Sequence, residues 1–169
     1  MFDDIAPTYD RLNHILSFNI DRLWRKRVVR IVRRTGAKRI LDLATGTGDL
    51  AIALARRIRD CSVCGADLSP QMLAAAQRKI ERIGLDERIT LTECQAEHID
   101  LPAASVDAAT IGFGIRNFEN REASLAELMR TIKSGGTLVI LEFSNPTSPI
   151  VRWAYRLYSH CLLPVVGGM

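Results

Sequence analysis

A long apolar run is the first feature that this 169-residue chain lacks. None of its hydrophobic stretches approaches the roughly 20 residues that a helix needs to cross a bilayer. The acidic start, MFDDIAPTYD, also lacks the apolar segment of a secretory signal. With 47% hydrophobic and 25% charged residues and no internal repeats, the composition is typical of one soluble globular domain, and we expect a cytoplasmic protein.

Cysteine and histidine are scarce, which argues against a metal centre. The three histidines are scattered, and the four cysteines are Cys61, Cys64, Cys94 and Cys161. Cys61 and Cys64 have C-x-x-C spacing, but they fall in a predicted strand, where residues i and i+3 point to opposite faces. A zinc site needs more ligands at regular spacing. We therefore predict no metal and interpret the cysteines as buried free thiols in a reducing compartment.

Acidic residues are missing from residues 22–39, a stretch that holds nine basic residues. The chain has a net charge of +4, and without this stretch it would be mildly acidic. The apolar residues that recur at helical spacing within it are Trp24, Val28, Ile31 and Val32. We therefore expect one helix with an apolar packing face and a basic face. Two interpretations of the basic face remain open: it contacts an anionic partner, or it is an ordinary face exposed to solvent.

Short apolar strands alternate with helical patterns through the middle of the chain. The predicted strands are Arg39–Leu43, Ser62–Asp67, Ile89–Cys94, Ala108–Phe113 and Thr137–Phe143. The helical faces between them are Leu50, Leu54 and Ile58, then Leu73, Ala76, Ile80 and Ile83, then Leu125, Leu128 and Ile132. Ser69 and Pro70 should begin the second of these helices, and Gly84 should end it. This alternation predicts an α/β fold, with a mostly parallel sheet and helices on both faces.

A glycine-rich turn, LDLATGTGD, follows the first predicted strand. In a parallel sheet, ligands bind beside this turn at the carboxyl ends of the strands. Gly46 and Gly48 let the backbone approach a ligand closely, and Asp67, at the end of the second strand, can accept hydrogen bonds from a ribose. The spacing also fits a dinucleotide fingerprint. However, Asp42 in the first strand would repel a pyrophosphate and attract the cationic groups of S-adenosylmethionine, so we favour S-adenosylmethionine over NAD.

Four motifs, LDLATGTGD, ADLSPQML, IGFGIRNF and LVILEFSNP, resemble the successive motifs of class I S-adenosylmethionine-dependent methyltransferases. With the opening block MFDDIAPTYDRLNHILSFNIDRLWR, the chain is similar to the UbiE/MenG family of ubiquinone and menaquinone biosynthesis C-methyltransferases, from residue 2 to about residue 168. The resemblance implies a Rossmann-like fold divided into an N-terminal helical lid (1–35), a cofactor-binding domain (36–145) and a C-terminal loop and helix (146–169). Relatives continue into an antiparallel strand pair that completes the sheet. We therefore expect either a truncated chain with an exposed fifth strand or a sheet that something else completes.

The resemblance also implies roles for individual residues. The residues matched to the binding of S-adenosylmethionine and its product S-adenosylhomocysteine are Asp42, Gly46, Thr47, Gly48, Asp67, Leu68, Gln95, Ala96 and Gly112. The catalytic candidates are Arg116 and Asn117, after the fourth strand, and Tyr9 in the N-terminal block. Arg116 would stabilise a phenolate or hold a water, with a surface ion pair as the alternative. Tyr9 would close over the site as part of the lid.

The implied reaction is C-methylation of a prenylated quinol, with demethylmenaquinol to menaquinol as the nearest match. The alternatives are C-methylation in ubiquinone biosynthesis, methylation of another small molecule or of RNA, and a truncated cofactor-binding module without activity. A nucleic-acid substrate is disfavoured, because GFGIRN stands where enzymes acting on exocyclic amines typically carry an Asn/Asp-Pro-Pro-aromatic segment. For a membrane-held quinol, the basic stretch 22–39 would contact anionic lipid at the inner face of the membrane. The sequence leaves a homodimer open.

Overall fold

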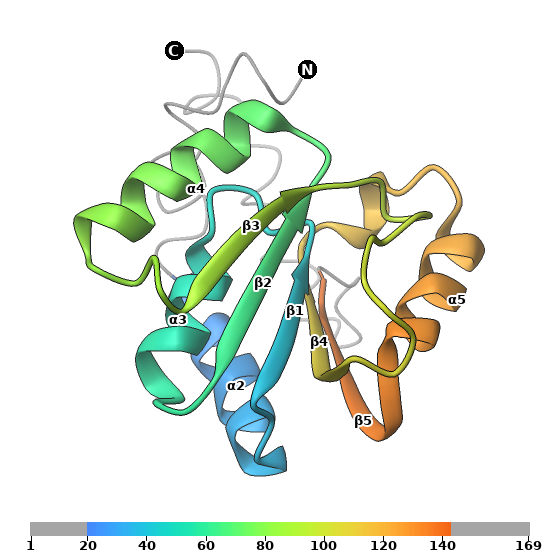
Figure 1. The fold of residues 1–169 in the computed structure, drawn as a ribbon, viewed down its shortest axis with the longest axis horizontal. Helices are drawn as coiled ribbons and strands as arrows, with labels where there is room; N and C mark the ends of the chain where they lie inside the picture. Colours follow the sequence, from blue (N-terminus) through green and yellow to red (C-terminus); the bar gives the residue numbers. More distant parts are fainter. Residues whose placement is uncertain (1–19, 143–169) are drawn as a thin grey trace, which may run out of the picture.

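The computed structural model describes residues 20–142, which form an α/β unit (Figure 1). Its elements in chain order are α2 (Ile20–Thr35), β1 (Arg39–Leu43), α3 (Asp49–Arg57), β2 (Ser62–Asp67), α4 (Pro70–Arg82), β3 (Ile89–Glu93), β4 (Val106–Gly112), the 3-10 turn η1 (Ile115–Asn117), α5 (Arg121–Thr131) and β5 (Ile132–Leu141). Residues 1–19 of the predicted lid, which include Tyr9, and the predicted C-terminal loop and helix lie outside the described residues.

The five strands form one parallel sheet in the order β3-β2-β1-β4-β5. The predicted parallel sheet is therefore confirmed. The chain runs outward from β1 to β3 and then crosses back to β4 on the other side of β1. This reversal creates a switch point at the carboxyl ends of β1 and β4, where ligands bind in open α/β sheets. Asp42 of β1 lies opposite Thr110 of β4 at this place.

Helices cover both faces of the sheet, as the alternation predicted (Figure 1). On one face, α2, α3 and α4 pack against Ile40 and Val63. On the other face, Leu128 of α5 packs against Leu41 and Ile111. Successive residues of β1 thus enter different cores, because side chains alternate along a strand. This double burial explains why the strands read as continuous apolar runs.

The strand bounds agree with the sequence for β1 and β2 and differ for the others. β3 ends one residue early, at Glu93, and β4 begins at Val106 instead of Ala108 and ends at Gly112. β5 begins at Ile132, which the helical periodicity had placed in a helix, and ends at Leu141. Ile132 has extended backbone angles and pairs with Val106. The pairing then skips to Thr137, so the predicted Gly135-Gly136 turn interrupts the pairing inside β5.

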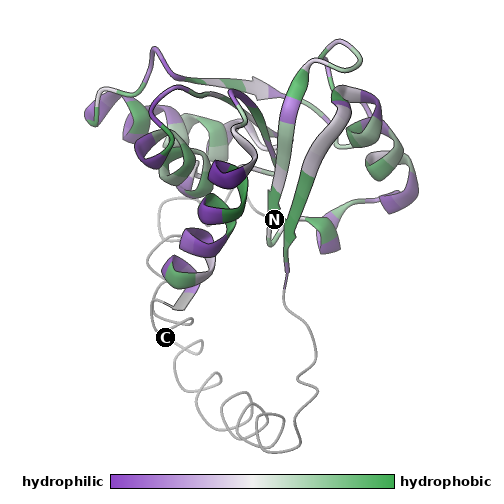
Figure 2. Cartoon of the chain, turned by 90° about the horizontal axis from the view of Figure 1, so that it is seen from below, coloured by the Kyte–Doolittle hydropathy of each residue, from purple (hydrophilic) through white to green (hydrophobic). Residues whose placement is uncertain are grey.

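The basic stretch is not one helix over residues 22–39. α2 ends at Thr35, next to Gly36 with φ of 72°, so Lys38 and Arg39 lie beyond it. Its buried apolar residues are Val28, Val29 and Val32, whereas Ile31 is 40% exposed. The buried face of α2 is therefore rotated about the helix axis relative to the predicted one. At 100° per residue, Val29 lies on the same side of the helix as Val32, and Ile31 lies outside this buried face. Figure 2 shows hydrophilic residues recurring along α2.

The start and end of α4 are confirmed. Ser69 Oγ accepts a hydrogen bond from the backbone N–H of Met72, and Pro70 is the first helical residue. The helix ends at Arg82, and Gly84 adopts φ of 64° two residues later. The buried face is Met72, Ala76 and Ile80, so Leu73 does not belong to it. This burial brings α4 against the glycine-rich turn.

Candidate functional site

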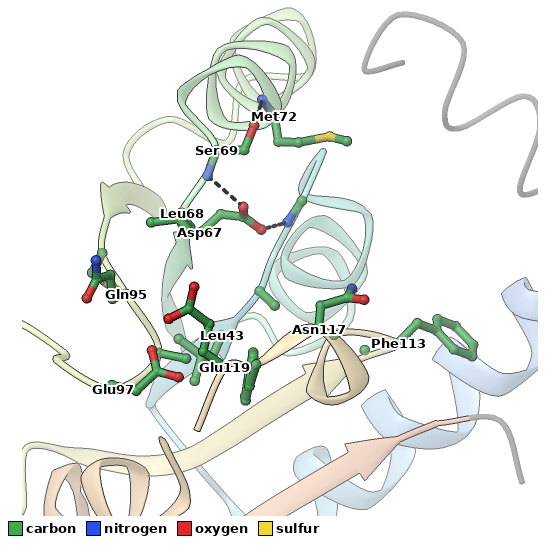
Figure 3. Close-up of a pocket in the computed structure, with 17 residues that line it drawn as sticks. Leu43, Asp67, Leu68, Ser69, Met72, Gln95, Glu97, Phe113, Asn117 and Glu119 are labelled. Carbon is green, nitrogen blue, oxygen red and sulfur yellow. Dashed lines mark hydrogen bonds between the residues drawn. The ribbon is translucent and has the colours of Figure 1, made fainter. Parts of the chain in front are cut away.

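A cavity of about 330 Å³ opens at the carboxyl ends of β1 to β4 (Figure 3). This volume falls within the range of small-molecule sites. The described residues that line it are Leu43, Ala44, Gly46, Asp67, Leu68, Ser69, Met72, Cys94, Gln95, Ala96, Glu97, Gly112, Phe113, Gly114, Asn117, Phe118 and Glu119. The cavity therefore lies at the switch point that the sheet topology defines.

The glycine-rich turn forms one wall of the cavity. Gly46 and Gly48 have φ of 55° and 79°, in the left-handed region that glycine tolerates best. A Cβ on Gly48 would lie 3.1 Å from Ala76 Cβ, so this glycine lets α4 pack closely on the turn. A Cβ on Gly46 would meet nothing within 4 Å, so its backbone faces open space.

Asp67 holds the turn from the end of β2. Its Oδ2 accepts a hydrogen bond from the Gly46 N–H at 2.7 Å, and its Oδ1 accepts one from the Ser69 N–H at 3.0 Å (Figure 3). Each carboxylate oxygen has a second lone pair, so Asp67 can still accept hydroxyl donors from a ligand. The predicted role of Asp67 as a ribose acceptor fits this geometry.

Asp42 lies beneath the turn rather than in the cavity wall. It is buried, and its carboxylate accepts hydrogen bonds from Thr45 Oγ1 at 2.7 Å and Thr110 Oγ1 at 2.6 Å. Burial raises the pKa of Asp42 to about 6, although both hydroxyl bonds oppose the shift. Asp42 can therefore act on a ligand through its charge and through Thr45, not by direct contact.

The cavity has an acidic lining. Asp67, Glu97 and Glu119 contribute carboxylates, and the described lining residues include no lysine, arginine or histidine. The Asn120 N–H donates to Glu97 and lowers the pKa of that carboxyl, so it stays charged at neutral pH. Such a lining attracts a cationic ligand and repels a pyrophosphate. The sulfonium and ammonium groups of S-adenosylmethionine fit this charge, whereas the pyrophosphate of NAD does not.

The structure brings most of the predicted residues together. Those in the cavity lining are Gly46, Asp67, Leu68, Gln95, Ala96, Gly112 and Asn117. Thr47 and Gly48 belong to the turn but not to the lining, and Thr47 is buried. Arg116 also lies outside the described lining.

Arg116 forms an ion pair at the border of the site. Its Nη1 lies 2.6 Å from Glu142 Oε1, directly after β5, and its side chain is 46% exposed. Arg121 supports the backbone there by donating to the carbonyls of Ile115 and Arg116. The ion pair that the sequence offered as an alternative for Arg116 is therefore present, next to the strand end where the cavity lies.

Sequence reasoning missed Phe113 as a lining residue. Phe113 has φ of 60°, which is unusual for a bulky side chain, and such strain is frequent at functional sites. Its ring is directed toward α2, away from Asp67 (Figure 3), and its centroid lies 5.9 Å from that of Trp24. The signal in the sequence was the Phe113-Gly114 pair that follows β4. Glu97 and Glu119 carried no comparable signal.

The cysteines give no sign of a metal or redox site in the described part of the chain. Residues 20–142 contain no group of three or more His, Cys, Asp or Glu side chains that could hold a metal ion. Cys61, Cys64 and Cys94 are free thiols, but only Cys61 is fully buried. Cys94 lines the cavity, and burial raises its pKa to about 11, so its thiol stays protonated.

Comparison with solved structures defines the class of fold. A methyltransferase from Aquifex aeolicus, described as S-adenosylmethionine-dependent, matches with a TM-score of 0.61 at 22% identity, over 82% of this chain and 77% of that one. A Methanococcus maripaludis protein assigned to the same class matches with a TM-score of 0.74 at 24% identity, over 95% of this chain and 73% of that one. The fold is that of the S-adenosylmethionine-dependent methyltransferases, as the sequence predicted.

The sequence comparison is more specific. The profile of the ubiE/COQ5 methyltransferase family matches residues 1–169, and the chain belongs to this family. It is 48% identical to the ubiquinone/menaquinone biosynthesis C-methyltransferase UbiE of Syntrophotalea carbinolica, over all of this chain and 70% of the relative. It is 47% identical to the demethylmenaquinone methyltransferase of Thermus thermophilus, over all of this chain and 76% of the relative. The predicted family is confirmed.

Proposed function

We propose that this protein transfers a methyl group from S-adenosylmethionine to a ring carbon of a prenylated quinol, converting demethylmenaquinol to menaquinol. The observation that supports S-adenosylmethionine as the cofactor is the acidic cavity beside the glycine-rich turn. The acceptor rests on family membership and on relatives named for this chemistry. A benzoquinol of ubiquinone biosynthesis is the second candidate, because another relative is named for both pathways.

The proposed binding mode runs along the strand ends. The ribose hydroxyls bind Asp67, and the adenine lies beside Gln95 and Ala96. These residues end β2 and follow β3. The opposite end of the cofactor lies over the glycine turn, where the charge of Asp42 favours its cationic groups. Gly112 and Leu68 contribute backbone and apolar surface to the same lining.

The quinol would then enter from the β4 side of the cavity. The cofactor supplies a methyl group on a positively charged sulfur. Overall, the ring exchanges one hydrogen for this methyl group and one proton is released, so no metal is required. Alignment of the ring carbon with the methyl group provides much of the acceleration. Phe113 and Asn117 line this side of the cavity.

Arg116, Asn117 and Tyr9 are the proposed catalytic residues. A phenol must lose its proton before the neighbouring ring carbon becomes a good nucleophile. In this proposal Arg116 stabilises the phenolate while Glu142 orients its guanidinium, and Asn117 positions the acceptor. Tyr9 belongs to the N-terminal block, where it closes over the acceptor.

The basic face of α2 is the proposed membrane contact. No helix within residues 20–142 is long and apolar enough to span a bilayer. However, α2 exposes Arg27, Arg30 and Arg34 on one side, with Leu23 60% exposed among them. Cations around an exposed apolar side chain suit anionic headgroups, and a quinol with an isoprenoid tail resides in a membrane. The protein would then work at the cytoplasmic face of the membrane.

The direct test is methyl transfer from labelled S-adenosylmethionine by the full chain. Prenylated demethylnaphthoquinol and a prenylated benzoquinol serve as the two acceptors. We expect label in the naphthoquinol product. Preference for the benzoquinol would support the second candidate, and label in neither quinol would contradict the proposal. In cells lacking the gene, demethylmenaquinone should accumulate, and the gene should reverse this change.

Two substitutions separate cofactor binding from catalysis. Asp67→Ala should weaken binding of S-adenosylmethionine by roughly tenfold or more, because the turn and the ribose lose their acceptor. Arg116→Ala should leave that affinity unchanged and lower kcat by about 100-fold. Calorimetry measures the first effect and steady-state kinetics the second. Equal loss of cofactor binding in both variants would refute the division of roles.

A further inference from the structure

A half-buried lysine of α4 contacts the glycine-rich turn on the side where α4 packs against it. Lys79 of α4 lies one helical turn after Ala76, which packs against Gly48. Its Nζ donates to Thr47 Oγ1 at 3.1 Å and to Asp49 Oδ1 at 2.7 Å. Thr47 is part of the turn, and Asp49 is the first residue of α3. The Lys79 side chain thus connects the glycine-rich turn and the start of α3 to α4.

A residue of α2, Arg25, also contacts Asp49. Arg25 Nη1 donates to Asp49 Oδ2 at 2.8 Å, so the carboxylate of Asp49 lies between two cations. Arg25 also forms an ion pair with Asp21, one turn earlier in α2. The Arg25 side chain is 17% exposed and that of Lys79 is 22% exposed, so solvent screens these contacts less than it screens ordinary surface pairs.

The chemistry of Lys79 fixes the orientation of Thr47. An ammonium group can only donate hydrogen bonds, so the Thr47 oxygen is the acceptor in this contact. The hydroxyl hydrogen of Thr47 must therefore point away from Lys79. An uncompensated lysine charge beside the turn would oppose a cationic ligand, but Asp49 neutralises it. The pair can hold the turn without adding net charge to the site.

We propose that Lys79 is a positioning residue for the cofactor turn: it orients the Thr47 hydroxyl and, through Asp49 and Arg25, fixes the turn relative to α3 and α2. This inference rests on the proposed function, because it assumes that S-adenosylmethionine binds at this turn. Lys79 touches no reacting atom in this assignment. Its effect is expected in cofactor affinity and not in the chemical step.

The test compares Lys79→Met with Arg78→Met in the full chain. Arg78 is exposed on the same helix, so its replacement removes an equal charge without touching the turn. Lys79→Met should weaken calorimetric binding of S-adenosylmethionine by about tenfold, and Arg78→Met by about twofold or less. Lys79→Arg, which keeps the donor, should recover part of the loss. With a quinol acceptor, the KM for the cofactor should rise while kcat changes by about twofold or less.

A double-mutant cycle shows whether the effect passes through Thr47. In a Thr47→Val background, Lys79→Met should weaken binding by only about twofold or less. A full tenfold loss in that background, or unchanged binding in Lys79→Met, would overturn the positioning role. If Lys79→Met does not fold, the cycle uses Lys79→Ala, which also removes the donor, with the same criterion. Absence of binding to the unmodified chain would instead refute the proposed function.

Discussion

At the scale of single residues, Asp42 is the group whose charge would set how strongly the proposed site attracts a cation. Its carboxylate is buried beneath the turn, and its pKa is raised to about 6. The ligand-free protein therefore holds a proton on Asp42 below this pH. Because the folded pKa lies above the ordinary value, the stabilisation from the protonated form is lost as pH rises through 6. A cationic ligand reverses this preference by favouring the ionised carboxylate.

Affinity for S-adenosylmethionine should consequently increase with pH. Between about pH 5 and pH 7.5, we expect the dissociation constant to fall on the order of tenfold. Asp42→Asn should bind more weakly and show a nearly flat profile, because its side chain does not titrate. Calorimetry across this range measures both curves. The assignment fails if the variant keeps the pH dependence of the unmodified chain.

The sequence predicted site residues that lie at or shortly after the ends of strands. Gly46 and Asp67 could be predicted because the carboxyl ends of parallel strands meet at one edge of the sheet, and Gln95 because of the resemblance to the family. Lys79 could not, because it lies 32 residues from Thr47 and meets it only after α4 packs on the turn. Glu119 was missed for the same reason, since its place in the same cavity lining as Asp67 depends on the crossover from β3 to β4.

At the scale of elements, the predicted bounds agree for β1 and β2. Burial alone does not explain this agreement, because β4 is enclosed by two neighbouring strands as well and its bounds differ at both ends. Ile132 satisfied the helical spacing of α5 but pairs with Val106 as the start of β5. The end of α2 was also missed, because the run of basic residues continues past Gly36 into β1. Composition alone does not mark where a helix ends.

The side chain of Asp107, near the amino end of β4, accepts hydrogen bonds from residues near the amino ends of β1 and β5. Asp107 Oδ2 accepts from the backbone N–H groups of Lys38 and Arg39, and Oδ1 lies 2.6 Å from Lys133 Nζ. These contacts lower the pKa of Asp107 to about 2. Its stabilising effect is therefore present above pH 4 and is lost as pH falls toward 2.

Asp107→Asn should lower the free energy of unfolding by about 1 kcal/mol at neutral pH, with solvent screening keeping the loss small. Urea unfolding at about pH 7 and pH 2.5 measures the difference between the two proteins. The difference should shrink at the lower pH, since the carboxyl group of the unfolded chain is protonated there, so ionisation of Asp107 in the folded protein contributes less to stability. An undiminished difference at low pH would show that packing, not charge, is responsible.

The exposed face of α2 gives a test of membrane contact. Replacing Arg27 and Arg30 by Gln should weaken binding to vesicles of phosphatidylcholine and phosphatidylglycerol by about tenfold or more, at roughly 1 kcal/mol per cation. Replacing the exposed Arg78 and Arg82 of α4 removes the same charge and should have little effect. Sedimentation measures bound protein. Equal binding to vesicles of phosphatidylcholine alone would exclude the electrostatic contact.

At the scale of the whole molecule, the cofactor should stabilise the fold. The proposed site draws on β1, β2, β3 and β4, so its ligand binds only the folded chain. At a ligand concentration 100 times the dissociation constant, the gain is about 2.7 kcal/mol, or a rise in Tm of roughly 5–10 °C. S-adenosylmethionine should produce this rise, and NAD should not. A shift with NAD alone would favour a dinucleotide site.

The acidic lining of the cavity also bears on how a catalytic cycle would end. S-adenosylmethionine carries a sulfonium charge, whereas S-adenosylhomocysteine has a neutral thioether. In the proposed binding mode, methyl transfer therefore removes one positive charge from a ligand held in a cavity that the carboxylates of Asp67, Glu97 and Glu119 make acidic. The site would loosen its hold on the spent cofactor at the moment of reaction, so that turnover itself drives product release.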